Sequence, residues 1–82
     1  MYNIVLTKRA LKDIEKINVE IKSKIGGKIE ILTKDPFGNS KKLSNSKIGT
    51  YRYRVGDYRV IFDIENDTVI ILRIGHRKDI YK

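Results

Sequence analysis

The stretch from Thr50 to Phe62, which reads TYRYRVGDYRVIF, limits the possible folds of this chain more than any other segment. In its first half arginine stands at every second position, with tyrosine or valine between. Because successive side chains of a strand point to opposite faces of a sheet, this alternation predicts a strand with one buried face and one basic face. Gly56-Asp57 predicts a tight turn, since glycine adopts positive φ without steric cost. The segment is therefore expected to form an antiparallel β-hairpin.

The turn length determines which residues of this hairpin face each other. A two-residue turn places Val55 opposite Tyr58 and Arg54 directly opposite Arg59. Like charges on facing positions destabilise a pair of strands, so folding alone does not favour this arrangement. We therefore interpret the face that carries the arginines as an anion site, formed by Arg52, Arg54 and Arg59. The opposite face is predicted to join the core, with Tyr51, Tyr53, Val55, Tyr58, Val60 and Phe62.

The segment before the hairpin predicts one strand and two helices. Residues 2–6 favour a short strand, and Thr7 and Asn18 are typical N-cap residues of helices. Apolar residues recur at helical spacing after each cap, at Ala10, Leu11, Ile14 and Ile17, and at Ile21, Ile25, Ile29 and Leu32. Asp35-Pro36 ends the second helix. Gly26-Gly27 interrupts its pattern, which predicts either a kink or another segment packed too closely for a side chain.

The apolar run after the hairpin is compatible with two registers. We place Ile70, Leu72 and Ile74 in the core, which requires a three-residue loop at Glu65-Asn66-Asp67. The competing two-residue loop would bury Arg73, and an unpaired buried charge is costly. The chosen register adds two basic residues to the side of the hairpin arginines, Arg73 and Arg77. It also leaves an apolar strip on that side for a protein partner, formed by Ile61, Val69 and Ile71.

These elements predict a single α+β domain over residues 1–82, in the order β-α-α-β-β-β. Two helices are expected to pack on one face of a mainly antiparallel sheet. The chain has no cysteine and one histidine, so neither a disulfide nor a metal site is expected, and no cofactor is implied. No stretch is long and apolar enough to span a membrane. We therefore expect a cytoplasmic protein with no membrane partner.

The formal net charge is +8, and the two basic residue types are segregated along the chain. Ten of the twelve lysines precede Ile48, whereas five of the six arginines lie between Arg52 and Arg77. Arginine offers a planar fork of donors that matches phosphate, so this distribution favours a polyanionic partner. The polar segment 37–49 is either a solvated connector or a contact to a phosphate backbone through Lys41, Lys42 and Lys47.

The hairpin sequence YRYRVGDYRVIF and the later GHRKDIY, at residues 75–81, resemble the RelE/ParE superfamily of toxin–antitoxin toxins in order, spacing and length. The resemblance covers nearly the whole chain. It implies a RelE-like fold and a ribosome-dependent mRNA endonuclease, an mRNA interferase that cuts mRNA in the ribosomal A site and inhibits translation. It also implies neutralisation by a cognate RelB-like antitoxin. The superfamily leaves a second function open, the inhibition of DNA gyrase by binding alone, as in ParE-like toxins.

The functional positions of the family match five residues of this chain: Arg52, Arg54, Arg59, Arg77 and Tyr81. RNA cleavage by its own 2′-hydroxyl needs a proton acceptor, a stabiliser of the charged phosphorane and a proton donor. Arginine serves only the second role, because it does not lose its proton in proteins. Some active relatives carry lysines where Arg52 and Arg54 stand, which puts proton transfer at these two positions in doubt.

Proton transfer is therefore assigned to Tyr81, His76, Lys78 or a group outside the chain. A dense positive field favours the charged form of a tyrosine and so suits Tyr81 to this role. A lone histidine at the end of a strand is also typical of a surface residue, which is the alternative for His76. Further RNA contacts are expected from six residues: Arg73, His76, Lys78, Lys41, Lys42 and Lys47.

Overall fold

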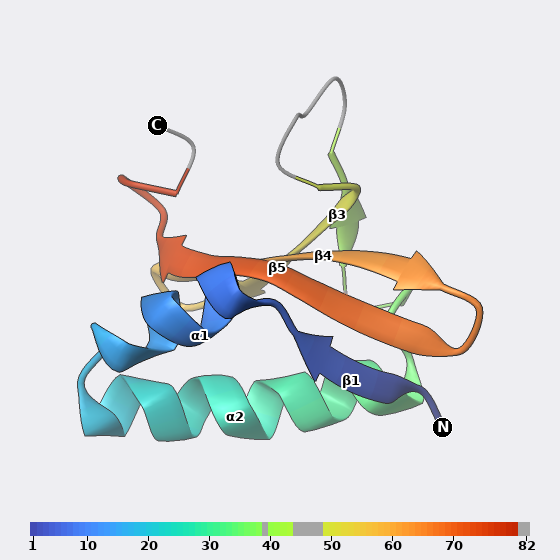
Figure 1. Ribbon diagram of the computed structural model, residues 1–82, viewed down its shortest axis with the longest axis horizontal. Coiled ribbons are helices and arrows are strands. Elements are labelled where there is room, and N and C mark those ends of the chain that lie inside the picture. Colours follow the sequence, from blue (N-terminus) through green and yellow to red (C-terminus); the bar gives the residue numbers. More distant parts are fainter. Residues whose placement is uncertain (39, 44–48, 81–82) are drawn as a thin grey trace.

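The computed structural model describes residues 1–38, 40–43 and 49–80. These residues form β1 (Asn3–Leu6), α1 (Lys8–Glu15), α2 (Val19–Lys34), β2 (Lys41–Lys42), β3 (Tyr51–Val55), β4 (Tyr58–Glu65) and β5 (Thr68–His76). The strands form one sheet in the order β1-β5-β4-β3-β2, in which β1 is parallel to β5 and the other neighbours are antiparallel. Both helices lie on one side of this sheet (Figure 1). The predicted α+β fold is confirmed, and the short strand β2 adds to it.

Side-chain caps determine where both helices begin. The Thr7 hydroxyl accepts a hydrogen bond from the Ala10 N–H at 3.1 Å, and the Asn18 side chain accepts one from the Ile21 N–H at 3.0 Å. Both predicted caps are therefore confirmed. The helix α2 continues through Gly26-Gly27, and a Cβ added at either glycine would meet nothing within 4 Å. Close packing thus does not explain the glycine pair. No helix of the described residues is long and apolar enough to cross a membrane.

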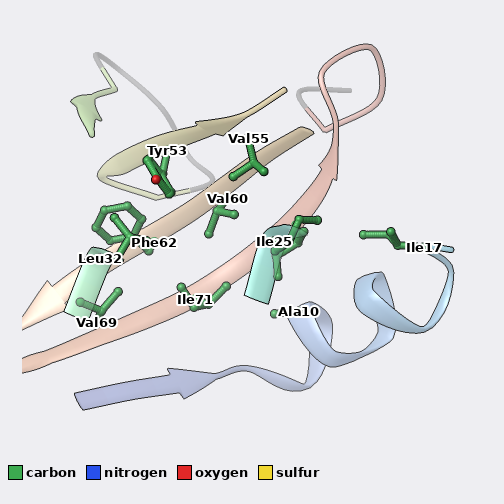
Figure 2. Packing of buried hydrophobic residues seen from close by; sticks show 11 residues of the cluster. Ala10, Ile17, Ile25, Leu32, Tyr53, Val55, Val60, Phe62, Val69 and Ile71 are labelled. Atoms are coloured by element: carbon green, nitrogen blue, oxygen red, sulfur yellow. The ribbon is translucent and has the colours of Figure 1, made fainter. Parts of the chain in front are cut away.

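The main core lies between the helices and the sheet (Figure 2). The helices contribute Ala10, Ile17, Ile25 and Leu32, and the sheet contributes Tyr53, Val55, Val60, Phe62, Val69, Ile71 and Ile74. Burial raises the pKa of the Tyr53 hydroxyl above its usual value, so this tyrosine keeps its proton at neutral pH. The predicted core face of the hairpin is confirmed. In α1 the prediction is wrong for Leu11, which is 51% exposed, because it lies to one side of the buried stripe.

The register of β5 differs from the prediction. Glu65 pairs with Thr68, so the loop between β4 and β5 has two residues, and Asn66 takes a φ of 57° there. A β-bulge follows: Phe62 pairs with Ile71 and Ile61 with Arg73, which leaves Leu72 as the extra residue. The bulge shifts the alternation by one residue. Val69 and Ile71 are therefore in the core before it, and Ile74 is in the core after it, with no need for a buried Arg73.

This register removes the apolar strip that was expected beside the arginines. Val69 and Ile71 are fully buried beneath the helices. Ile61 lies on the other face but is also fully buried. A Cβ added at Gly49 would come within 2.8 Å of the Ile61 and Leu72 side chains, so the Gly49 backbone lies directly on them. The prediction of a partner-binding strip at these residues is therefore wrong.

Ile71→Ala tests this register. The substitution should lower the free energy of unfolding by about 2–5 kcal/mol, because it leaves a cavity where a fully buried side chain packed. Val5→Ala on the neighbouring strand is the matched control, since Val5 is 50% exposed, and it should cost less than about 1 kcal/mol. Urea denaturation measures both values. Equal losses in the two variants would contradict the position of Ile71 in the core.

Candidate functional site

Four basic side chains from three neighbouring strands line one depression in the sheet: Lys41 of β2, Arg52 and Arg54 of β3, and Arg59 of β4. Arg52 and Arg54 alternate with the buried Tyr53 and Val55, so they point away from the helices. The ladder pairs Lys41 with Arg52 and Arg54 with Arg59. The predicted facing pair of arginines is thus confirmed, and β2 brings Lys41 beside it. We call these four residues the basic depression.

The size and charge of the basic depression suit a single anionic group. Its volume is about 140 Å³, below the 300–1,000 Å³ range typical of pockets for whole small molecules. All four described residues that line it, Lys41, Arg52, Arg54 and Arg59, are basic. Like charges on facing positions repel each other, and a bound phosphate would relieve this repulsion. Donors that converge on one point also stabilise charge that develops there during a reaction.

The guanidinium of Arg59 is held by the backbone of its own hairpin. Its Nη1 atom donates hydrogen bonds to the carbonyl oxygens of Gly56 and Tyr58, both at 2.9 Å. The turn that presents these carbonyls contains Gly56 at a φ of 58°, as predicted for this glycine. Two bonds from one nitrogen limit rotation of the guanidinium plane, so Arg59 is presented to the basic depression in a defined orientation.

Arg77 lies at the same turn, just after the end of β5. Its backbone N–H donates to the carbonyl of Asp57 at 2.8 Å. Its Nε atom lies 3.6 Å from Oδ1 of Asp57, in an ion pair whose side chains are 54% and 68% exposed. Arg77 does not line the basic depression itself. The structure therefore brings Arg77 to the hairpin through Asp57, a residue that the sequence alone suggested only as part of a turn.

Arg73 points to α1 instead of joining the hairpin arginines, so this expectation was wrong. Its Nε and Nη2 atoms donate to the two oxygens of Asp13, at 2.8 and 3.3 Å. Asp13 also accepts a hydrogen bond from the Ile74 N–H at 3.0 Å. These bonds join α1 to the part of β5 that extends beyond the end of β1. Asp13 satisfies both Arg73 and this backbone donor, which makes the pair a connection between helix and sheet.

His76 and Arg73 line a second cavity of about 350 Å³, between the end of α1 and the end of β5. His76 pairs with Tyr58 in the ladder, and their rings meet edge to face with centroids 5.4 Å apart. Its Nδ1 atom accepts a hydrogen bond from the Lys78 N–H at 3.1 Å. Neither His76 nor Arg73 lines the basic depression. The described residues contain no group of three or more His, Asp or Glu side chains that could hold a metal ion.

The chain after β5 turns back onto the sheet. The Asp79 and Ile80 N–H groups both donate to the His76 carbonyl, at 2.9 and 3.0 Å. Ile80 is fully buried, and a Cβ added at Gly75 would lie 3.5 Å from its side chain. Gly75 is the ladder partner of Arg59. Buried packing therefore anchors this segment against Gly75, the residue beside Arg59 in the sheet.

The remaining predicted residues have varied positions. Lys42 pairs with Tyr51 and is exposed, and Lys78 is exposed in the turn after β5. Lys47 and Tyr81 lie outside the described residues. Sequence reasoning missed the roles of Asp13 and Asp57 as partners of arginines. No short-range pattern reveals Asp13, which is 60 positions from Arg73.

The fold and the basic depression define a class of small basic α+β proteins whose helices cover one face of the sheet and leave the other face basic. One protein family matches this chain over residues 4–81. It is described as the ParE toxin of the type II toxin–antitoxin system, ParDE. The chain therefore belongs to this family of toxins from type II toxin–antitoxin systems. RelE-type relatives place it within the wider RelE/ParE superfamily, as the resemblance implied.

Two curated relatives and one solved structure illustrate this similarity. Toxin RelG of Mycobacterium tuberculosis is 33% identical over 87 residues, covering 99% of this chain and 97% of the relative. Toxin RelE3 of Methanocaldococcus jannaschii is 34% identical over 82 residues, covering 95% and 93%. A chain of the toxin–antitoxin complex RelBE2 from M. tuberculosis matches with a TM-score of 0.84 and 30% identity, covering 93% of this chain and 98% of that one.

Arg54→Ala tests whether the basic depression contacts phosphate. The variant should bind ribosomes and single-stranded RNA more weakly. The plot of log affinity against log salt concentration has a negative slope, and its magnitude should decrease by about 0.7, the value for one lost contact to a single strand. Arg9→Ala is the matched control, because Arg9 is exposed on α1, a helix that packs mainly on β5 and β1. Binding titrations over a range of salt concentrations measure both slopes. A slope for Arg54→Ala equal to that of the parent would exclude a phosphate contact.

Proposed function

We propose that this toxin is a RelE-type mRNA interferase, which cleaves mRNA in the ribosomal A site and so inhibits translation. The basic depression carries the proposal, since four convergent cations provide the charge stabilisation that a phosphorane needs. Arg59, with two backbone bonds to hold its guanidinium, is suited to stabilise charge at one fixed position. Relatives named RelG and RelE3, each about one third identical over most of the chain, support the same function.

Proton transfer requires a group other than arginine. Tyr81 remains the proposed proton donor or acceptor, because its position matches that of the functional tyrosine of the family. Ile80, the residue before it in sequence, packs against the ladder partner of Arg59. Among the described residues that line the basic depression, Lys41 is the one that can release a proton. His76 and Lys78 are less suited, since neither lines the depression.

An antitoxin is the proposed protein partner. The solved relative from M. tuberculosis is itself a toxin–antitoxin complex. A small acidic or amphipathic antitoxin would complement the net charge of +8. To neutralise the toxin, the bound antitoxin needs only to cover the basic depression or to move the side chains that form it. We propose a RelB-like antitoxin for this role, with the ribosome and mRNA as the targets of the free toxin.

The alternative function is inhibition of DNA gyrase without catalysis. The description of the matching family as ParE toxins favours it. A protein that acts by binding alone does not require the combination of Arg52, Arg54, Arg59, Arg77 and Tyr81. This combination instead provides the charge stabilisation and the proton transfer that RNA cleavage demands.

Tyr81→Phe separates the two functions. The substitution keeps the ring and removes the hydroxyl, so binding should persist while cleavage of ribosome-bound mRNA falls by about 10²–10⁴. Arg59→Ala should lower cleavage by about 10²–10³, because it removes charge stabilisation and moves no proton. Single-turnover cleavage at matched ribosome occupancy measures both effects.

The nuclease function and the gyrase-inhibitor function predict different results in this experiment. Equal cleavage by the parent and Tyr81→Phe would exclude Tyr81 from proton transfer and direct attention to Lys41. In that case Lys41→Arg, which keeps the charge but cannot release a proton, is the next variant. A parent protein that inhibits gyrase supercoiling and leaves ribosome-bound mRNA intact would contradict the nuclease proposal.

A further inference from the structure

The Gly56-Asp57 turn makes contacts with two arginines that come from different parts of the chain. Arg59 belongs to β4 and donates two hydrogen bonds to the carbonyls of Gly56 and Tyr58. Arg77 follows β5 and is joined to Asp57 by a backbone hydrogen bond and a side-chain ion pair. One short turn thus contacts both residues at once. We propose that this turn positions Arg59 and Arg77, and that Asp57 is the positioning residue for Arg77.

The contacts at Asp57 are better suited to orienting the Arg77 side chain than to stabilising the fold. Exposed ion pairs contribute little to stability, and this pair has a separation of 3.6 Å with both side chains more than half exposed. The backbone bond at 2.8 Å determines where the Arg77 side chain starts. The carboxylate near Nε then biases its direction. A loose pair of this kind lets the guanidinium turn toward a phosphate when RNA arrives.

An acid at this position also has a cost. A carboxylate beside a cluster of arginines repels an incoming phosphate, so Asp57 would weaken the site if it served only the turn. Asparagine is equally favoured in such turns and carries no charge. The ion pair with Arg77 is the feature that asparagine would lose.

The conformation of Gly56 directs its carbonyl toward the Arg59 guanidinium, which donates a hydrogen bond to it. Gly56 has a φ of 58°, and its carbonyl direction depends on this left-handed conformation. Apart from its own chain neighbours, no atom of the described residues lies within 4 Å of a Cβ added there, so space is not the reason for glycine. Asparagine tolerates the left-handed region, whereas valine does not. Gly56→Asn should therefore preserve the Arg59 contacts, and Gly56→Val should disturb them.

The catalytic consequence rests on the proposed function and is tested with a double-mutant cycle. Asp57→Asn should lower kcat for cleavage of ribosome-bound mRNA by about 10–100-fold, because misplacement of a positioned group costs this much, and should leave KM nearly unchanged. Asp57→Glu, which keeps the charge, should recover part of the rate. In an Arg77→Ala background, Asp57→Asn should have no further effect, since Asp57 acts through Arg77. Thermal unfolding should be nearly unchanged in Asp57→Asn, because asparagine also suits the turn.

A second measurement needs no activity. Relaxation of the side-chain Nε–Hε group of Arg77, followed by NMR, reports its order on the picosecond to nanosecond timescale. Asp57→Asn should increase the mobility of Arg77 and leave that of Arg9 on α1 unchanged. If the parent cleaves no mRNA, the proposed function fails, while this measurement still tests the positioning.

Three results would overturn the proposal. Unchanged order at Arg77 in Asp57→Asn would show that the carboxylate does not orient it. A loss of rate in Asp57→Asn that persists at full size in the Arg77→Ala background would show that Asp57 acts independently. An increase in rate would show that Asp57 competes with the phosphate for Arg77.

Discussion

Two arginines face each other across the hairpin of β3 and β4, and the candidate site depends on the core that keeps them there. Facing like charges cost up to about 1 kcal/mol. On the opposite side of the same strands, Tyr53, Val55, Val60 and Phe62 are buried beneath the helices. Each large apolar side chain contributes about 1.5–3 kcal/mol when fully buried. Burial therefore exceeds the repulsion, and the core holds Arg54 and Arg59 in a register that repulsion alone would disfavour.

This balance explains why the hairpin and the helices could be predicted from the sequence. In β3 and β4, alternation assigns one face to the core without ambiguity, and Gly56 fits the turn. Thr7 and Asn18 cap the helices through contacts within three residues, which a sequence pattern can capture. The local features and the packing agree in these segments. Two arginine positions in β3 and one in β4 followed directly from that agreement.

The register of β5 could not be predicted in the same way. Residues 69–72 are apolar at every position, so alternation does not distinguish their two faces. The outcome depends on a bulge at Leu72 and on a partner for Arg73 that lies in α1. Both arise from tertiary packing. For the same reason the sequence did not reveal that Arg73 and His76 lie apart from the basic depression. It did predict a contact role for Lys41, but not the two-residue strand that holds Lys41 beside Arg52.

The proposed function requires that the basic depression act on RNA within the ribosome. Toeprinting of a translated message, with and without the purified protein, tests it most directly. A RelE-type interferase should give new stops at codons in the ribosomal A site, which appear only while the message is being translated. The same message without ribosomes should stay intact. An unchanged toeprint at saturating protein, with inhibition of gyrase by the same preparation, would contradict the account.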